Sequence, residues 1–365
     1  MRPLHNLNWQ EKQVIMQDEK ELILITGSCG RIGREIVKRL NEKYPIIGFD
    51  LLKAYYEDFA AKFVPMDLTS EESVYQAFQY IKNFYKGCKI ASFIHLASYY
   101  SFDQKESPLY QKITVEGTKR VLKALQDFEV EQFIFSSSML VHAPCSPEEK
   151  INEDWPLEGN WGYPRSKIRT EKLIKEERGK IPAVILRIAG GYNDDCSSIP
   201  LSHQIQRIYE NKIEAHFYPG KLSHGSSYVH FDDIVDAIEM TIAKRKKLPK
   251  EATFLIGEPK TLSYGFLQNE ISLLLFNKRI KTYKIPKMLA KIGAYAKTLF
   301  SKSKPFIKPW MISICDDNYT LDISRAKKIL GWQPNHDLET ALPKMIHSLK
   351  EDKDKWYKNH NLKKQ

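Results

Sequence analysis

Short apolar runs alternate with helical patterns over the first half of this 365-residue chain, and this alternation constrains the fold more than any other feature. The runs have the length and the branched residues of buried strands, and they lie at 22–26, 46–49, 62–66, 89–97, 132–136 and 183–188. Helical patterns lie between them at 31–42, 71–85, 109–128 and 163–178. Such alternation predicts a doubly wound α/β fold, in which helices cover both faces of a parallel sheet.

After Arg187 the pattern loosens. Residues 190–200 have the composition of a loop, and helical patterns follow at 201–211, 232–244, 262–276 and 286–300. We interpret the second half as a smaller substrate lobe over the edge of the sheet. The predicted parts are a polar leader (1–20), a nucleotide-binding domain (21–190, with 228–258 returning to it), a substrate lobe (191–227 and 259–350) and a basic tail (351–365).

Composition excludes several classes of protein. The five cysteines are scattered and form no CxxC pair, which argues against a disulfide framework and against a metal site. The formal charge of +11 comes mainly from residues after 241, and without a binding motif we interpret it as a solvated basic face rather than a nucleic-acid site. The chain has neither a signal-peptide core nor an apolar run long enough to span a bilayer, so we expect it in the cytoplasm.

A glycine-rich turn joins the first predicted strand to the first predicted helix. Glycines at this spacing let the chain turn sharply and bring backbone N–H groups close to a pyrophosphate at the helix N-terminus. Asp50 ends the next strand, where a carboxylate accepts hydrogen bonds from the adenosine ribose and repels a 2′-phosphate. This favours NAD over NADP. Asp67 either accepts from the adenine amino group or caps the helix near Ser70. The turn residues that we expect to bind the cofactor are Gly27, Gly30, Arg31, Ile32 and Gly33.

Tyr163 and Lys167 are four residues apart in a helical pattern, so the phenol and the ammonium share one helix face. A nearby cation favours the phenolate, which makes the tyrosine a better base near neutral pH, and the lysine can also donate to the nicotinamide ribose. The run Ser136–Ser138 follows the fifth strand, at the same edge of the sheet. We select Ser138 as the hydroxyl that holds the substrate oxygen beside Tyr163.

These residues together resemble the extended short-chain dehydrogenase/reductase family, whose members are also called NAD-dependent epimerase/dehydratases. The quoted segments are TGSCGRIG (26–33), HLAS (95–98), the serine run, YPRSK (163–167), SYVHFDD (227–233) and LDISRAKKILGWQP (321–334). The resemblance implies a Rossmann lobe with bound NAD(P), Ser138, Tyr163 and Lys167 as the catalytic residues, and a homodimer formed through helices such as 109–128 and 163–178. It also implies further cofactor contacts at Leu68, Leu96, Ala97, Ser98, Thr114, Ser136, Tyr163 and Lys167.

The sequence departs from the family pattern at several positions. Thr114 stands where relatives usually have asparagine. Gly190 and Ser226 replace an asparagine and an arginine with which nucleotide-sugar members contact the diphosphate. No acidic residue follows the serine run, which argues against a sugar 4,6-dehydratase.

The segment 285–300 forms a basic amphipathic pattern. Its apolar residues gather on one side, and Lys287, Lys291 and Lys297 on the other. Two interpretations are open, a helix that packs its apolar side inward and a helix that attaches to an anionic membrane or covers the substrate. We favour inward packing.

The predicted function is hydride transfer at a secondary alcohol or ketone by an NAD-dependent oxidoreductase. If the cofactor stays bound and hydride returns to the other face of the substrate, the net reaction is an epimerisation. The substrate is a nucleotide sugar in the first version and a sterol, isoprenoid or other lipid alcohol, as for a 3β-hydroxysteroid dehydrogenase, in the second. A third hypothesis is an NAD-binding sensor or scaffold without turnover.

Overall fold

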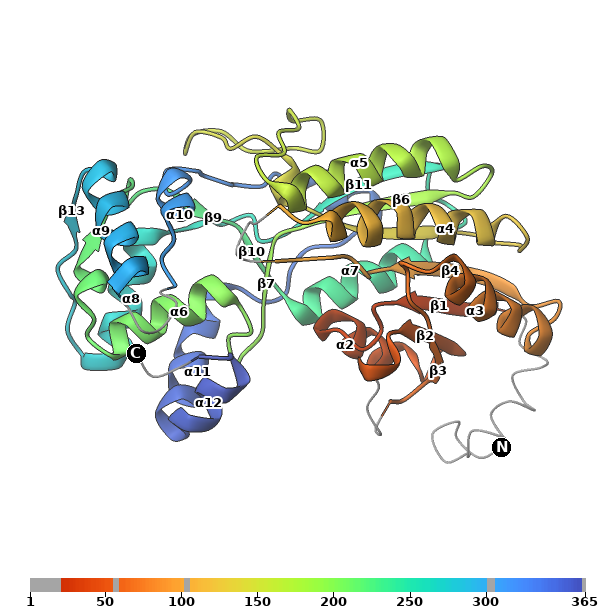
Figure 1. Ribbon diagram of the computed structural model, residues 1–365, viewed down its shortest axis with the longest axis horizontal. Coiled ribbons are helices and arrows are strands. Elements are labelled where there is room, and N and C mark those ends of the chain that lie inside the picture. Colours follow the sequence, from red (N-terminus) through yellow and green to blue (C-terminus); the bar gives the residue numbers. More distant parts are fainter. Residues whose placement is uncertain (1–20, 55–58, 102–105, 301–305, 363–365) are drawn as a thin grey trace.

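The computed structural model describes residues 21–54, 59–101, 106–300 and 306–362, so the predicted leader 1–20 lies outside the described residues. A seven-stranded parallel sheet with the order β11-β6-β5-β4-β1-β2-β3 forms the centre of the molecule (Figure 1). The Rossmann-type fold predicted from the alternating pattern is therefore confirmed. The sheet strands are β1 (Glu21–Thr26), β2 (Ile46–Asp50), β3 (Lys62–Pro65), β4 (Lys89–His95), β5 (Phe133–Ser138), β6 (Ala183–Ile188) and β11 (Glu251–Ile256).

Helices cover both faces of the sheet, because alternate residues of each strand point to opposite faces and both sets are apolar. One face packs against α2 (Arg31–Leu40) and α7 (Phe231–Ala243). The other packs against α3 (Glu71–Phe84), α4 (Glu116–Leu125) and α5 (Gly162–Glu177). A π-helical segment, η3 (Tyr110–Val115), precedes α4, where a continuous α-helix was expected.

The second half of the chain builds a separate hydrophobic core beside the carboxyl ends of the strands. Residues 190–200 are not only a loop, since Gly190–Tyr192 form the short strand β7 and pair with β10. The helices here are α6 (Ile199–Tyr209), α8 (Tyr264–Phe276), α9 (Lys287–Phe300), α10 (Pro309–Ser313), α11 (Leu338–Glu351) and α12 (Lys353–Asn359). The short strands are β8 (Phe217–Tyr218), β9 (Gly225–Ser226), β10 (Tyr228–His230), β12 (Leu262–Ser263) and β13 (Tyr283–Lys284), and the short helical segments of the chain are η2 (Leu52–Ala54), η4 (Met139–Val141), η5 (Ile213–His216) and η6 (Ala326–Leu330).

The predicted basic tail is wrong as a description of residues 353–362. These residues fold into α12, and Trp356 and Tyr357 are buried in the second core. The two aromatic side chains stabilise the packed helix more than the surrounding lysines favour an extended tail. Among the described residues, no helix has the length and apolar content needed to cross a membrane.

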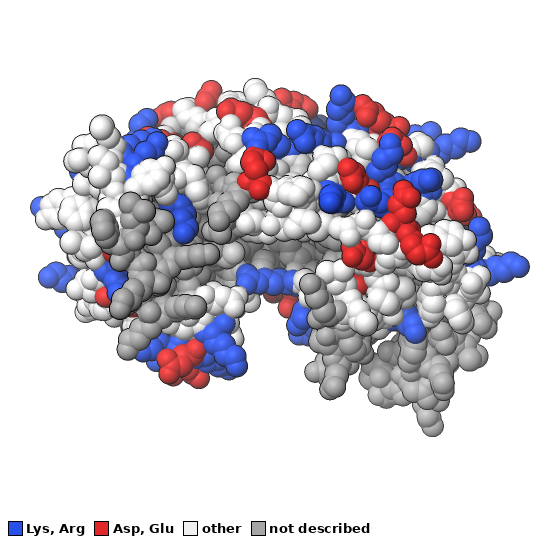
Figure 2. Space-filling view, in the orientation of Figure 1, with Lys and Arg blue, Asp and Glu red and all other residues white. Residues whose placement is uncertain are grey.

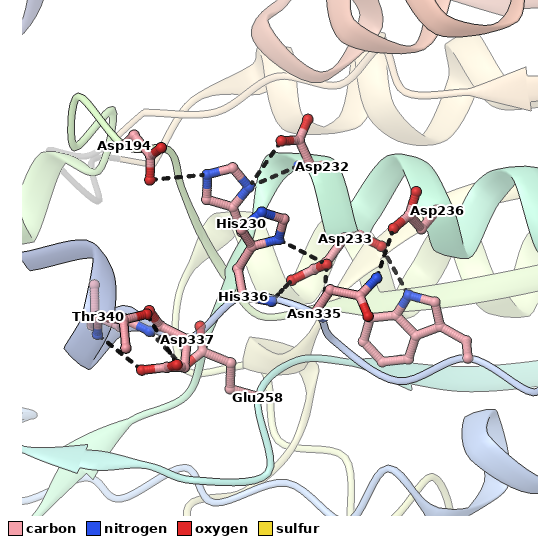
Figure 3. Close-up of polar contacts among 12 residues, drawn as sticks. Asp194, His230, Asp232, Asp233, Asp236, Glu258, Asn335, His336, Asp337 and Thr340 are labelled. Carbon is pink, nitrogen blue, oxygen red and sulfur yellow. Dashed lines mark hydrogen bonds and ion pairs between the residues drawn. The ribbon is translucent and has the colours of Figure 1, made fainter. Parts of the chain in front are cut away.

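A polar cluster ties the segment before α11 to the start of α7 (Figure 3). Nδ1 of His230 accepts the backbone N–H of Asp232 and so caps α7. The carboxylate of Asp233 accepts hydrogen bonds from the backbone N–H groups of Asn335 and His336. The backbone carbonyl of Asp233 accepts a hydrogen bond from the indole N–H of Trp332. These contacts make His230 and Asp233 anchors that join the two halves of the chain.

Candidate active site

A cavity of about 1050 Å³ lies between the carboxyl ends of the sheet strands and the second core. Figure 2 shows the molecule hollowed between its two lobes. The position agrees with the general rule that parallel α/β sheets bind ligands at this edge. The predicted cofactor residues that line the cavity are Gly27, Gly30, Arg31, Ile32, Gly33, Asp50, Asp67, Leu68, Leu96, Ala97, Ser98 and Ser136.

The glycine turn requires glycine at two positions for identifiable reasons. Gly27 has a φ of +71°, and a Cβ atom there would lie 2.9 Å from the backbone nitrogen of Ala97. A Cβ atom on Gly33 would lie 2.3 Å from the carbonyl oxygen of Gly27. The turn delivers the chain to Gly30 at the start of α2, which has no side-chain cap. The first N–H groups of α2 are therefore available to an anionic group such as a pyrophosphate.

Asp50 and Asp67 lie at the ends of neighbouring strands and face the same cavity. The Asp50 carboxylate accepts the backbone N–H of Cys29 at 3.0 Å and that of Leu51 at 2.8 Å, which holds it beside the glycine turn. Asp67 accepts the backbone N–H and hydroxyl of Thr69, both at 2.8 Å. Ser70, not Asp67, caps α3. The uncapped helix, the glycine cradle and the ribose-facing carboxylate fit a dinucleotide.

Ser138, Tyr163 and Lys167 come together from β5 and α5. The serine run forms the last residues of β5 rather than following the strand. The Ser138 hydroxyl is close enough to the Tyr163 phenol to lower its pKa, and Nζ of Lys167 lies 5.6 Å from the centroid of the Tyr163 ring. Nζ of Lys167 donates to the carbonyl oxygen of Ser136 at 2.7 Å. The predicted catalytic groups therefore form one cluster.

Two aromatic side chains stand between this cluster and the open cavity. The ring of Tyr163 packs edge-on against Tyr100, with centroids 5.0 Å apart, and lies 5.5 Å from Trp161. Tyr100 and Trp161 line the cavity, whereas Ser138, Tyr163 and Lys167 are not among its lining residues. A substrate in the cavity that approaches Tyr163 would contact these two rings.

Burial controls the protonation of Tyr163 and Lys167. It raises the pKa of Tyr163 to about 12, and the nearby Ser138 hydroxyl opposes this rise. Burial also lowers the pKa of Lys167 to about 7, against the opposing effect of Glu171. The expected depression of the tyrosine pKa by the lysine is therefore wrong, because desolvation has the largest effect on the phenol.

A buried ion pair that no sequence pattern predicted lies beside the cluster of Ser138, Tyr163 and Lys167. Glu171 accepts two hydrogen bonds from Arg187, at 2.7 and 3.1 Å, and a third from the hydroxyl of Ser137 at 2.5 Å. The side chains of Glu171 and Arg187 are 7% and 8% exposed. Because Ser137 is the neighbour of Ser138, and Glu171 is one helical turn after Lys167, the pair fixes both elements. A carboxylate four residues after Lys167 was the available signal.

Thr114, which we expected to contact the cofactor, and His95 both lie outside the cavity wall. The hydroxyl of Thr114 accepts the backbone N–H of Tyr99 at 3.0 Å, and its carbonyl accepts the hydroxyls of Thr118 and Thr170. His95 is fully buried and bonded through both ring nitrogens to Thr26 and Thr118, and burial lowers its pKa to about 3. His95 is thus a neutral core residue.

One group of residues has the spacing of metal ligands. Ligand atoms of His230, Asp232 and His336 lie within 4.8 Å of one another. Each residue already has a bonded partner: a backbone N–H for His230, Arg39 for Asp232 and the Asp233 carboxylate for His336. We therefore assign the cluster to the anchor between the two halves.

The cavity wall formed by the second half of the chain is mainly apolar and aromatic. Gly190 and Ser226 line the cavity, so neither position supplies an amide or a guanidinium there. Arg207 is the cation of α6 in this wall, and its Nη1 is buried without a hydrogen-bond partner among the described residues. The apolar and aromatic residues of this wall include Tyr218, Phe231, Leu262, Tyr264, Leu267, Trp310, Met311, Ile314 and Tyr319.

Comparisons with known proteins agree with this geometry. Residues 23–257 match the model of the NAD dependent epimerase/dehydratase family. The chain is 24% identical to the decarboxylating sterol-4-alpha-carboxylate 3-dehydrogenase of Candida albicans, with 92% of this chain and 100% of that protein covered. It is 25% identical to UDP-glucuronate 4-epimerase of Thermodesulfobacterium geofontis, with 90% and 96% covered. The crystal structure of dTDP-glucose 4,6-dehydratase from Bacillus anthracis in complex with NAD has a similar fold, with a TM-score of 0.68 at 18% identity over 93% of this chain and 99% of that one.

Proposed function

This chain belongs to the NAD dependent epimerase/dehydratase family. We propose that it is a dehydrogenase whose substrate is a large, mainly apolar secondary alcohol. The observation that carries the proposal is the substrate side of the cavity. Its wall is mainly apolar and aromatic, and Gly190 and Ser226 supply neither an amide nor a guanidinium to bind a diphosphate. The similarity to a sterol-4-alpha-carboxylate 3-dehydrogenase supports the same substrate class.

The glycine turn, Asp50 and the start of α2 hold the dinucleotide. NAD held there would supply the acceptor for the hydride of the alcohol carbon. Tyr163 takes the hydroxyl proton, and Ser138 donates a hydrogen bond to the substrate oxygen. Lys167 is held by the carbonyl of Ser136 beside the tyrosine ring, where the positive charges of its ammonium form and of an oxidised nicotinamide would favour the phenolate. Tyr100 and Trp161 exclude water from the proton-transfer step.

The test is the variant Tyr163→Phe, assayed by NADH formation with a 3β-hydroxysteroid. Loss of the phenolic hydroxyl removes the general base, so we expect kcat to fall by about 10²- to 10⁴-fold. The Kd for NAD should stay within about threefold, because the ring remains in place. Tyr110→Phe removes a second buried phenol near the same helix and is the matched control, with little change in kcat. Equal turnover by Tyr163→Phe and the parent enzyme would exclude the mechanism.

A nucleotide-sugar substrate, and hence an epimerase, is the second candidate. Arg207 favours it, because a buried guanidinium nitrogen without a partner suits a phosphate or carboxylate. Conversion of UDP-glucose to UDP-galactose without added NAD would identify this activity, and Arg207→Gln should weaken it. We further propose a homodimer through η3, α4 and α5, which sedimentation equilibrium can test.

A further inference from the structure

Helix α9 presents its large apolar side chains to solvent. Met288, Leu289, Ile292 and Tyr295 are 74%, 60%, 54% and 60% exposed. Their spacing places them on one side of the helix. Ala294, on the opposite side, is only 8% exposed. The expectation that 285–300 packs its apolar side inward is therefore wrong, because the small side chains face the protein and the large ones face out.

The surroundings of α9 are strongly basic. Residues 271–315 contain ten lysines and arginines and no aspartate or glutamate. Lys287 and Lys297 form ion pairs with Asp316 and Glu214, which lie outside that segment. Within the described residues, the remaining cations of 278–297 have no ion-pair partner, and they are Lys278, Arg279, Lys281, Lys284 and Lys291. Figure 2 shows lysine and arginine side chains spaced over this lobe and separated by uncharged surface.

Further exposed aromatic residues lie at the same end of the molecule. Strand β13 leads into α9 and pairs with β8 (Figure 1). Tyr283 of β13 and Phe217 of β8 are 47% and 39% exposed, with their rings 6.0 Å apart. We call Phe217, Tyr283, Met288, Leu289, Ile292 and Tyr295 the α9 surface. Exposed apolar side chains gathered in this way are typical of an interaction site.

The elements of the α9 surface also form part of the cavity wall. Helix α10 packs against α9, and Trp310 and Met311 of α10 line the cavity together with Ile314. Tyr218, the neighbour of Phe217 in β8, lines the cavity as well. One short helix and one short strand therefore separate the exposed surface from the substrate space.

We propose that the α9 surface docks on an anionic lipid bilayer. An exposed apolar side of a helix, with unpaired cations on the segment 278–284 that leads into it, is typical of a helix that lies in the interface plane. Anionic headgroups neutralise the cations that the protein itself leaves unpaired. A second copy would bring two strongly basic surfaces together, and like charges oppose that contact. If the proposed function also holds, a lipid alcohol passes from the bilayer to the cavity along α10.

The test is flotation of the full chain with vesicles of phosphatidylcholine, with and without phosphatidylglycerol, in the absence of NAD and substrate. We expect binding to the anionic vesicles at least about tenfold stronger than to the neutral ones, and weaker binding at high salt. Met288→Glu with Ile292→Glu should abolish it, and Lys284→Gln should weaken it about fivefold. Phe84→Glu is the matched control, because Phe84 of α3 is 63% exposed on the sheet lobe.

Absence of flotation, or equal binding to both vesicle types, would overturn the proposal. So would a concentration-dependent dimer that Ile292→Glu dissociates while the parent protein ignores vesicles. Circular dichroism and the Kd for NAD should show that each variant is folded. Tyr163→Phe should float like the parent chain, so a failure of the proposed function and a failure of membrane docking give different results.

Discussion

The buried pair of Glu171 and Arg187 supports the sharpest stability prediction. In Glu171→Gln the shape is kept, but the carboxylate that accepts three hydrogen bonds is lost. Apart from the single amide oxygen of the glutamine, Arg187 then keeps the carbonyl of Glu153 at 2.7 Å and Nε2 of His142 at 3.1 Å as partners. Breaking a buried pair by removing one partner typically costs about 3–5 kcal/mol. Since glutamine retains one acceptor, we expect a loss near 3 kcal/mol in the free energy of unfolding.

Urea unfolding followed by circular dichroism measures this loss. Arg187→Met alone should cost a similar amount, and the double variant should recover much of it, because no unpaired charge remains. Lys172→Gln is the control on the same helix. It breaks an exposed pair with Glu176, at 3.8 Å, and should change stability by less than about 1 kcal/mol. A loss below about 1 kcal/mol in Glu171→Gln, with no coupling in the cycle, would refute the reasoning.

Two further predictions concern Lys167 and Asp50. The folded pKa of Lys167, about 7, lies below its ordinary value of 10.5, so the unfolded chain binds more protons between those values and stability should rise with pH there. Thermal unfolding of Lys167→Met should show a flatter rise between pH 7 and 9.5, and an unchanged slope would contradict the buried neutral lysine. Asp50→Asn removes the charge that repels a 2′-phosphate, so the ratio of the Kd values for NADP and NAD should fall about tenfold or more by calorimetry. In Glu158→Gln, which alters another part of the cavity wall, that ratio should stay constant.

The strands and helices around the glycine turn could be predicted because each carries its own local pattern. The buried runs before Gly27, Asp50 and Ser138 are apolar on both faces, as parallel strands require. Strand β11 was not predicted as a strand. Its first residues, Glu251 and Ala252, are polar or small, and it lies at the sheet edge beside β6. The π-helical geometry of η3 was also missed, because six residues are too few to distinguish a π from an α period.

Some features of the site could likewise be predicted from a single segment, and others could not. The glycine cradle and the Tyr163–Lys167 spacing depend on neighbours in sequence, and a single segment therefore predicts them. The screen formed by Tyr100 and Trp161, and the ion pair of Glu171 with Arg187, join residues from different elements. No local pattern specifies which tyrosine covers Tyr163. Burial, which sets the pKa values of Tyr163 and Lys167, likewise depends on the whole fold.

The error at α9 has a general physical cause. Periodicity divides a helix into two sides, but it does not state which side faces the rest of the protein. Inward packing of large residues requires a complementary apolar surface, and α9 instead approaches its neighbours with Ala294 and the stem of Lys287, whose ammonium reaches Asp316 at 2.7 Å. Water then solvates Met288, Leu289, Ile292 and Tyr295 at a cost of about 25 cal/mol for each square ångström of apolar area. A folded chain can tolerate this cost if an apolar medium other than its own core covers these side chains. The unpaired lysines around α9 favour a medium with an anionic surface, such as an anionic bilayer.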